Sequence, residues 1–188
     1  VGHDAAPGVV RVRVVGRGRW GFDALAYVQA RDFTNIVVSA TSFRPTLNQR
    51  ATPSTGIGGK FELRPPVGAA HVLRLGADGR QARGHIVEDA ISAVTGKVSA
   101  ARRAGGVNAD IGLYAEDDWT LGRLVLTGGA RFDRWSIRNG FFRETSAAGV
   151  VTVDNRFADR SGWATSLRGG AMWRAGDAFS LRAATYSG

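Results

Sequence analysis

The segment 112–135, GLYAEDDWTLGRLVLTGGARFDRW, places an apolar or small residue at every second position although it is rich in charge. After its central turn, Leu126 and Phe132 share one phase, while Arg131 and Asp133 share the opposite phase. A period of two is typical of a β-strand with two different faces. This alternation constrains the fold more than any other feature of the chain, because only two kinds of fold are compatible with it, a soluble antiparallel sheet and a membrane barrel.

The same alternation continues through most of the chain, and it predicts about nine strands. They lie near residues 8–17, 19–31, 33–43, 57–65, 70–80, 108–119, 123–137, 162–174 and 178–187. The segment 85–102, HIVEDAISAVTGKVSAAR, is the one stretch whose spacing is compatible with a helix. Around 140–158 the neighbouring strand pair is expected to extend further. A membrane-spanning helix is excluded, because no apolar run approaches the roughly 20 residues it needs.

The predicted connections fall into two classes of length. Short turns lie at 120–123 and 174–178, whereas long polar loops are expected at 44–56, 81–107 and 138–161. Short turns at one end and long loops at the other are typical of an up-and-down transmembrane barrel. The predicted strands also reach about ten residues, near the length that crosses a tilted bilayer.

Tryptophan distribution and composition agree with a barrel. All five tryptophans lie near predicted strand ends, where aromatic girdles mark the membrane interfaces: Trp20, Trp119, Trp135, Trp163 and Trp173. Glycine is abundant, at 26 residues, which suits β-structure with many turns. Cysteine is absent, which excludes disulfides, thiolate metal sites and cysteine nucleophiles. The net charge of +9 first suggests an anionic partner, but the arginines are spread through strands rather than clustered as in a nucleic-acid module.

Three short motifs match patterns of functional sites, and none of them is convincing. GRGRWG (16–21) matches the dinucleotide pattern formally, but a strand-like segment follows it where a helix is needed. HIVED (85–89) offers one histidine and two carboxylates in a predicted loop, too few histidines for a convincing metal site. AEDDW (115–119) holds adjacent carboxylates that alternation sends to different faces. No nucleophile elbow is present, so we expect no catalytic site, metal site or cofactor.

The hairpin YAEDDWTLGRLVLTGGARFDRW resembles that of TonB-dependent outer-membrane receptors. In those barrels an acidic-acidic-Trp turn precedes a strand that reads Leu-x-Leu-x-x-Gly-x-Arg-x-Asp. Here the matching residues are Leu124, Leu126, Gly129, Arg131 and Asp133. Segment 51–66 resembles the loop and strand that precede a barrel hairpin in some of these receptors, and segment 163–188 resembles a later hairpin. The resemblance covers roughly residues 15–188.

The resemblance implies an all-β, antiparallel up-and-down transmembrane β-barrel segment of about nine to ten strands. Because a complete barrel of this kind has roughly 22 strands, we expect residues 1–188 to be a partial receptor barrel, without the plug domain, the TonB box and the C-terminal barrel strands. The implied function is active import across the bacterial outer membrane of a ferric siderophore, a cobalamin or a glycan. The implied partners are outer-membrane lipid, an unidentified small ligand and the TonB system acting through a plug.

Polar residues of the inward phase are the candidate functional residues. The candidates for the lumen-facing wall are Arg131, Asp133, Arg168, Arg182 and Tyr186, with Arg64 and Arg74 as further possibilities. Arginines there are expected to pair with Asp110, Glu116, Asp133 or Glu62 in ion-pair ladders. Such ladders order the wall or contact a plug, and structural pairing is favoured over substrate binding.

Two other functions stay open on the sequence. One is a passive, porin-like or purely structural outer-membrane barrel, which differs by having no plug. The other is a soluble antiparallel β-protein that binds an anionic partner and buries its apolar phase in a closed core. The membrane hypothesis instead predicts outward-pointing apolar residues, namely Leu124, Leu126, Phe132, Leu167 and Leu181.

Overall fold

The structure is a computed structural model that describes residues 3–176 and 178–188, and it is a single antiparallel sheet of ten strands. The strands are β1 (His3–Arg17), β2 (Gly21–Val38), β3 (Pro45–Ala51), β4 (Ser54–Arg64), β5 (His71–Ile91), β6 (Val98–Leu121), β7 (Leu124–Ser146), β8 (Val151–Arg156), β9 (Arg160–Arg174) and β10 (Ser180–Ser187). The predicted all-β, up-and-down antiparallel fold is therefore confirmed. Among the described residues, no helix is long and apolar enough to cross a membrane.

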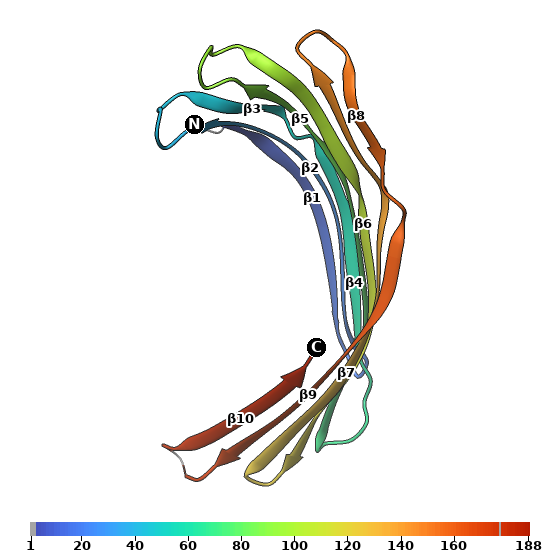
Figure 1. The fold of residues 1–188 in the computed structure, drawn as a ribbon. Helices are drawn as coiled ribbons and strands as arrows, with labels where there is room; N and C mark the ends of the chain where they lie inside the picture. The colour runs from blue at the N-terminus through green and yellow to red at the C-terminus, as the bar shows by residue number, and fades with distance from the viewer. Residues whose placement is uncertain (1–2, 177) are drawn as a thin grey trace.

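The strands follow one another across the sheet in chain order. Eight of them form one hydrogen-bonded path, β1-β2-β3-β5-β6-β7-β9-β10. The other two strands share places with strands of that path. β4 pairs with β2 and β5, as β3 does, and β8 pairs with β7, as β9 does. The sheet bends into a trough with a concave and a convex face (Figure 1).

The two phases of the alternation occupy the two faces of this trough. One row of the convex face, followed through the strand pairing, reads Val14, Ala24, Phe61, Ala77, Leu113, Phe132 and Thr165. One row of the concave face reads Asp23, Glu62, Gly76, Tyr114, Arg131 and Ser166. Cross-strand neighbours lie on the same face of a sheet, so pairing gathers residues that are distant in the chain.

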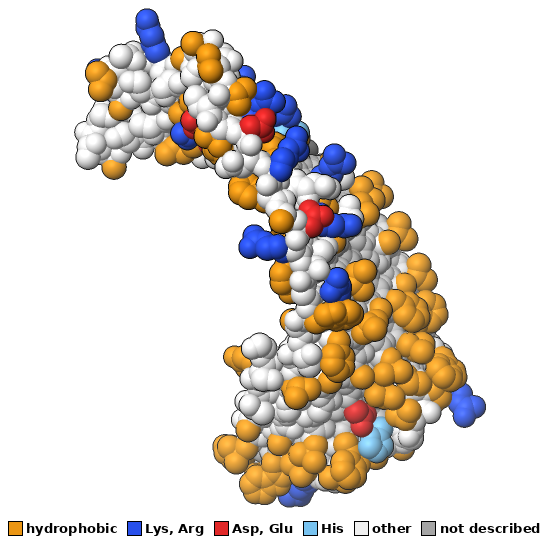
Figure 2. Space-filling model, turned by 45° about the vertical axis from the view of Figure 1, so that its right-hand side comes forward, with side chains coloured by type: hydrophobic (Ala, Val, Ile, Leu, Met, Phe, Trp, Pro, Cys, Tyr) orange, Lys and Arg blue, Asp and Glu red, His pale blue; other side chains and the backbone are white. Residues whose placement is uncertain are grey.

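The convex apolar side chains lie at the surface. Leu113 is 58% exposed, Phe132 52% and Leu167 55%, and Val107 is the one buried hydrophobic residue of the described chain. Figure 2 shows hydrophobic side chains covering the lower part of the face it presents. An exposed apolar surface of this extent is unfavourable in water. The predicted outward residues Leu124, Leu126, Phe132, Leu167 and Leu181 all lie in the convex phase.

The segment with helix-compatible spacing, 85–102, is a β-hairpin and not a helix. β5 continues to Ile91, a tight turn follows, and β6 begins at Val98. The predicted loop 81–107 is consequently two long strand ends joined by this turn, and HIVED (85–89) lies in β5. Small residues between the charges blurred the period of two, whereas pairing of Glu88 opposite Arg102 across the hairpin stabilises the strands.

The first loop prediction also needs correction. The break expected near residue 32 is absent, since β2 runs unbroken from Gly21 to Val38. The expected loop 44–56 contains β3 and the start of β4, which are separated at Thr52 and Pro53. Proline has no N–H to donate, so the strand is interrupted there. Asp32 stabilises the interruption by accepting a 2.8 Å hydrogen bond from the Thr52 N–H.

The third expected loop, 138–161, is mostly strand as well. β7 extends to Ser146 and pairs there with β8, in agreement with the strand extension expected around 140–158. The extension passes through an irregularity, because the β6–β7 register shifts between Gly105 and Val107 and Asn139 has a φ of 54°. Asparagine tolerates this left-handed conformation better than most residues. The short turn predicted at 120–123 is confirmed between β6 and β7.

Candidate functional site

The concave face carries a network of ion pairs and hydrogen bonds, made of neighbouring clusters between β1 and β9. At its centre, Arg131 of β7 contacts Asp78 of β5 with both terminal nitrogens, at 2.6 and 2.9 Å. Arg131 also contacts Asp133, two residues along its own strand, at 2.7 Å. The Tyr114 ring lies between the two strands, with the guanidinium carbon 5.9 Å from its centroid. This two-carboxylate arrangement fixes the arginine fork against the sheet.

A second cluster lies nearer the short turns. Arg74 of β5 donates to Glu116 and to Asp118, both at 2.8 Å. Arg168 of β9 reaches the same Glu116 from the other side. The Thr127 hydroxyl donates to Asp118 at 2.6 Å. Glu116 is buried at 9% exposure, and its two arginine neighbours compensate the loss of water around its charge.

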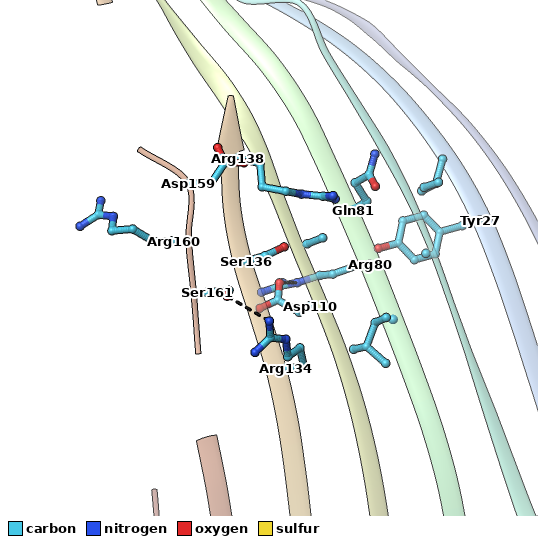
Figure 3. Close-up of a pocket in the computed structure, with 15 residues that line it drawn as sticks. Tyr27, Arg80, Gln81, Asp110, Arg134, Ser136, Arg138, Asp159, Arg160 and Ser161 are labelled. Carbon is cyan, nitrogen blue, oxygen red and sulfur yellow. Dashed lines mark hydrogen bonds and ion pairs between the residues drawn. The ribbon is translucent and has the colours of Figure 1, made fainter. Parts of the chain in front are cut away.

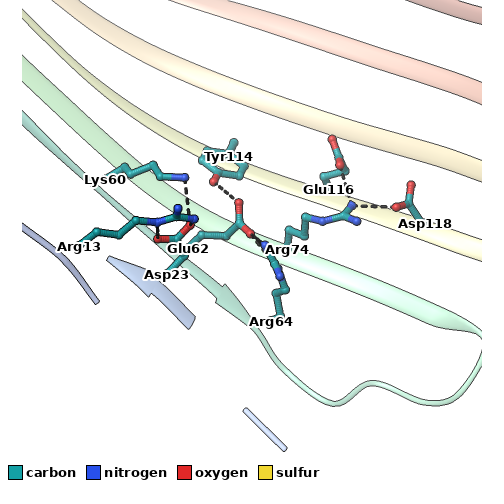
Figure 4. Close-up of polar contacts among 9 residues, drawn as sticks. All are labelled: Arg13, Asp23, Lys60, Glu62, Arg64, Arg74, Tyr114, Glu116 and Asp118. Atoms are coloured by element: carbon teal, nitrogen blue, oxygen red, sulfur yellow. Dashed lines mark hydrogen bonds and ion pairs between the residues drawn. The ribbon is translucent and has the colours of Figure 1, made fainter. Parts of the chain in front are cut away.

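A third cluster, towards the N-terminal edge, is drawn with the second in Figure 4. Asp23 of β2 is buried at 6% exposure, accepts two hydrogen bonds from Arg13 at 3.0 and 2.8 Å, and lies 3.4 Å from the Lys60 ammonium. Glu62 accepts the Tyr114 hydroxyl at 2.8 Å and also binds Arg64. Tyr114 therefore connects Glu62 to Arg131 at the centre of the wall.

Of the five predicted wall residues, the network contains Arg131, Asp133 and Arg168. Arg182 and Tyr186, on the last described strand β10, lie in the same concave phase and make no ion pair with another described residue, and Tyr186 is 86% exposed. Together with Arg168 they line a depression of about 920 Å³ on the last strands. All five residues thus belong to one face, but they divide into a paired group and an open group.

Several members of the network were missed by sequence reasoning, above all Asp23 and Asp78. Each is an isolated carboxylate on its own strand, and its partner comes from another strand: Arg13 for the first and Arg131 for the second. The position of Asp23 and Asp78 in the alternation could have shown that both lie on the concave face. Strand register was also required, because it alone decides which charges become neighbours.

Polar pairing continues from the edge of the apolar band into the long hairpins. Arg80 lies 3.0 Å from Asp110, and Arg102 donates to Glu144 at 2.7 Å. The Arg102 hydrogen bond, assisted by the Thr152 hydroxyl, lowers the pKa of the Glu144 carboxyl below its ordinary value. These pairs add side-chain links between strands that are already paired through their backbones.

The three short motifs of the sequence lie in strands and turns of the sheet. GRGRWG is the turn between β1 and β2, so a strand follows it. Within the described residues, no group of three or more potential metal ligands is found. His71 lies on the convex face, 2.6 Å from Asp117, and stacks on Trp119. AEDDW is split between the faces as expected, with Glu116 and Asp118 concave.

The concave face is therefore a polar wall in which most charged side chains are paired with one another.

Residues 12–188 match a family model described as TonB dependent receptor-like, beta-barrel. The fold is similar to the ferric yersiniabactin uptake receptor FyuA from Yersinia pestis, with a TM-score of 0.65 at 13% identity, over 88% of this chain and 25% of that one. This chain thus spans about a quarter of that receptor. No curated protein matches it in sequence.

Proposed function

This chain belongs to the TonB-dependent receptor β-barrel family, and we propose that it forms part of the wall of an active importer in the bacterial outer membrane. Receptors of this family are transporters of that membrane and not enzymes. The observation that carries the proposal is the contrast between the faces of one sheet. The convex face exposes an apolar band, whereas the concave face carries the paired charges.

The dimensions of the apolar band support a place in the bilayer. On β6 the convex phase is largely apolar from Ala109 to Trp119, positions that are ten residues apart (119 − 109). At about 3.3 Å per residue this is roughly 33 Å along the strand. A strand tilted by about 40° then covers roughly 25 Å, which is the height of the apolar band of an outer-membrane barrel.

The concave wall is suited to a water-filled or plugged lumen. Ion pairs across the strands order the wall without presenting large areas of unpaired charge. We propose that Arg131, Asp133 and Arg168 act mainly as such wall pairs, while Arg182 and Tyr186 remain available to contact a plug or a ligand. Their open side chains and the depression beside them support this division.

The proposed cargo is a scarce nutrient of the ferric siderophore, cobalamin or glycan class, and its import draws energy from TonB through a plug domain. The structural similarity to a ferric yersiniabactin uptake receptor favours the siderophore class among these three. The hairpins that end at 39–44, 92–97 and 147–150 extend from one end of the trough. We propose that they form the mouth at which the ligand is selected.

The orientation of the faces is tested with two adjacent residues, Ser166 on the concave face and Leu167 on the convex face. Because the chain has no cysteine, single variants Ser166→Cys and Leu167→Cys each carry one spin label. In lipid vesicles, the label at Leu167 should collide mainly with oxygen dissolved in the bilayer. The label at Ser166 should collide with a water-soluble nickel chelate. Equal exposure of both labels to the nickel chelate would disprove the membrane orientation and favour the soluble β-protein.

Energy coupling is tested separately from orientation. Cells that depend on the natural protein for growth on one ferric siderophore, cobalamin or glycan are compared with the same cells lacking TonB. An active importer supports uptake only when TonB is present. Uptake that persists without TonB contradicts active transport and favours the passive barrel, whose membrane orientation is the same.

A further inference from the structure

The convex face carries arginines of a different kind from those of the concave wall. Arg83 of β5 and Arg138 of β7 both face Val107 of the intervening β6, one from each side. Both side chains are exposed, and neither has an ion-pair partner among the described residues. Arg131 and Arg74 on the opposite face, by contrast, each hold two carboxylates.

These arginines lie directly beyond the apolar band. Along the convex phase of β5 the residues change from Leu75 through Gly79 and Gln81 to Arg83, and along β7 from Phe132 through Arg134 and Ser136 to Arg138. Figure 2 shows the same change as basic side chains above a hydrophobic region. The uncompensated charge therefore lies where the polar surface of a bilayer begins.

The side chain of Arg134 extends from the apolar band towards the polar part of the convex face. Its backbone is level with Ile111, inside the apolar band, but its guanidinium donates to the Ser161 hydroxyl at 3.0 Å, one row further towards the polar end. Its stem leaves the guanidinium carbon 5.2 Å from the centroid of the Trp163 ring. A long basic side chain that reaches from the apolar zone to the interface in this way is snorkelling.

We propose that Arg83, Arg134 and Arg138 form a binding patch for the phosphate groups of anionic membrane lipids. The proposal rests on the proposed function in one respect, namely that the convex face contacts the bilayer. A guanidinium presents a planar fork of N–H groups that matches phosphate oxygens. Figure 3 shows Gln81, Ser136 and Ser161 beside Arg134 and Arg138 around one depression, where they add uncharged donors.

The nearby carboxylates do not cancel this patch. Asp32 lines a depression together with Arg83, but it accepts hydrogen bonds from the Phe33 and Thr52 N–H groups at 2.9 and 2.8 Å, and no ion pair joins it to Arg83 among the described residues. Asp159 lines the same depression and accepts a hydrogen bond from the Asn139 N–H at 2.9 Å, and no ion pair joins it to Arg138. Asp154 lies one strand further and faces Arg143, at 4.0 Å. Asp110 is engaged with Arg80, whose phase is concave.

Continuity with the apolar band favours a lipid over a soluble anion. A phosphate held by Arg83 and Arg138 would have its acyl chains directly below it, against convex side chains such as Ile111 and Trp163. One lipid molecule would then contact the arginines with its phosphate and the apolar side chains with its acyl chains. Inorganic phosphate uses the polar end alone and leaves the apolar side chains uncovered.

The test uses the natural protein that carries these residues, purified in a non-ionic detergent. Binding of a short-chain phosphatidic acid is titrated and followed by native mass spectrometry, with the matching phosphatidylcholine and inorganic phosphate as comparison probes. The variant is Arg83→Gln/Arg138→Gln. The control, Arg11→Gln/Arg17→Gln, removes the same charge from exposed concave-phase arginines of β1 that make no ion pair with another described residue.

Each basic residue at an anionic lipid surface contributes a factor of about five to binding, so the double variant should bind phosphatidic acid roughly 25-fold more weakly. The control should change binding less than about threefold. Arg83→Lys/Arg138→Lys, which retains charge but not the fork, should fall between the two. Equal weakening in both Gln variants, or none in either, would overturn the proposal. Inorganic phosphate that competes as strongly as the lipid would assign the patch to a soluble anion.

Failure of this patch is distinguishable from failure of the membrane proposal. If the convex face contacts the bilayer but the patch is wrong, the label at Leu167 still reports lipid while phosphatidic acid and phosphatidylcholine bind alike. If the face does not contact the bilayer, that label reports water.

Discussion

Removing Arg131 tests how far the concave network stabilises the wall. The side chain makes three hydrogen bonds to two carboxylates and is 36% exposed. Exposed ion pairs contribute up to about 1 kcal/mol, whereas breaking a buried pair costs about 3–5 kcal/mol. This half-exposed arginine with two partners lies between those limits. We therefore expect Arg131→Met to lower the free energy of unfolding by about 2–3 kcal/mol, because Asp78 and Asp133 lose their shared cation.

The assay is urea unfolding in lipid vesicles, followed by tryptophan fluorescence, and it uses a double-mutant cycle with Asp78→Asn. Arg131→Lys should recover part of the loss, since it restores charge but not the two-nitrogen contact. The two single changes should be non-additive by at least about 1 kcal/mol. A loss below about 0.5 kcal/mol in Arg131→Met, or strict additivity with Asp78→Asn, would refute the reasoning, since the network would then contribute only as isolated surface charges.

Three further predictions address the two faces and the long hairpins. Phe132→Arg places a charge in the middle of the convex band and should cost about 2–4 kcal/mol in vesicle unfolding; a neutral result would contradict lipid contact there. Gly76→Ala brings a methyl group against the Tyr114 ring and should cost about 1–3 kcal/mol in the same assay. The matched change Gly128→Ala, with no atom within 4 Å, should be neutral or slightly stabilising, so equal losses would argue against the clash. The lowered pKa of Glu144 means that its stabilisation is complete above the ordinary pKa of about 4.5 and is lost as the pH falls through the lower folded value. The protection factors of the β7–β8 amides, which correct exchange rates for the intrinsic slowing at low pH, should therefore fall on acidification, and Glu144→Gln should remove that dependence.

The fold class was accessible from the sequence because alternation is a local property. Residues two apart on a strand face the same way whatever their partners are, so the phases of Leu126, Phe132, Arg131 and Asp133 could be assigned without a structure. Where small residues weakened the contrast between phases, as in 85–102, the assignment failed. Long polar segments were mistaken for loops for the same reason, since both faces of a hairpin outside the apolar band are polar.

The sequence by itself determined a two-faced antiparallel sheet, with outward apolar residues and inward arginines, and it pointed to the receptor family through one hairpin. Tertiary structure decided which charges meet: Asp23 between Arg13 and Lys60, and Asp78 beneath Arg131. It also separated the paired arginines of the concave face from the unpaired Arg83 and Arg138 on the convex face. The physical reason is that phase is encoded within a strand, whereas register is set between strands by turns, bulges and pairing over long separations.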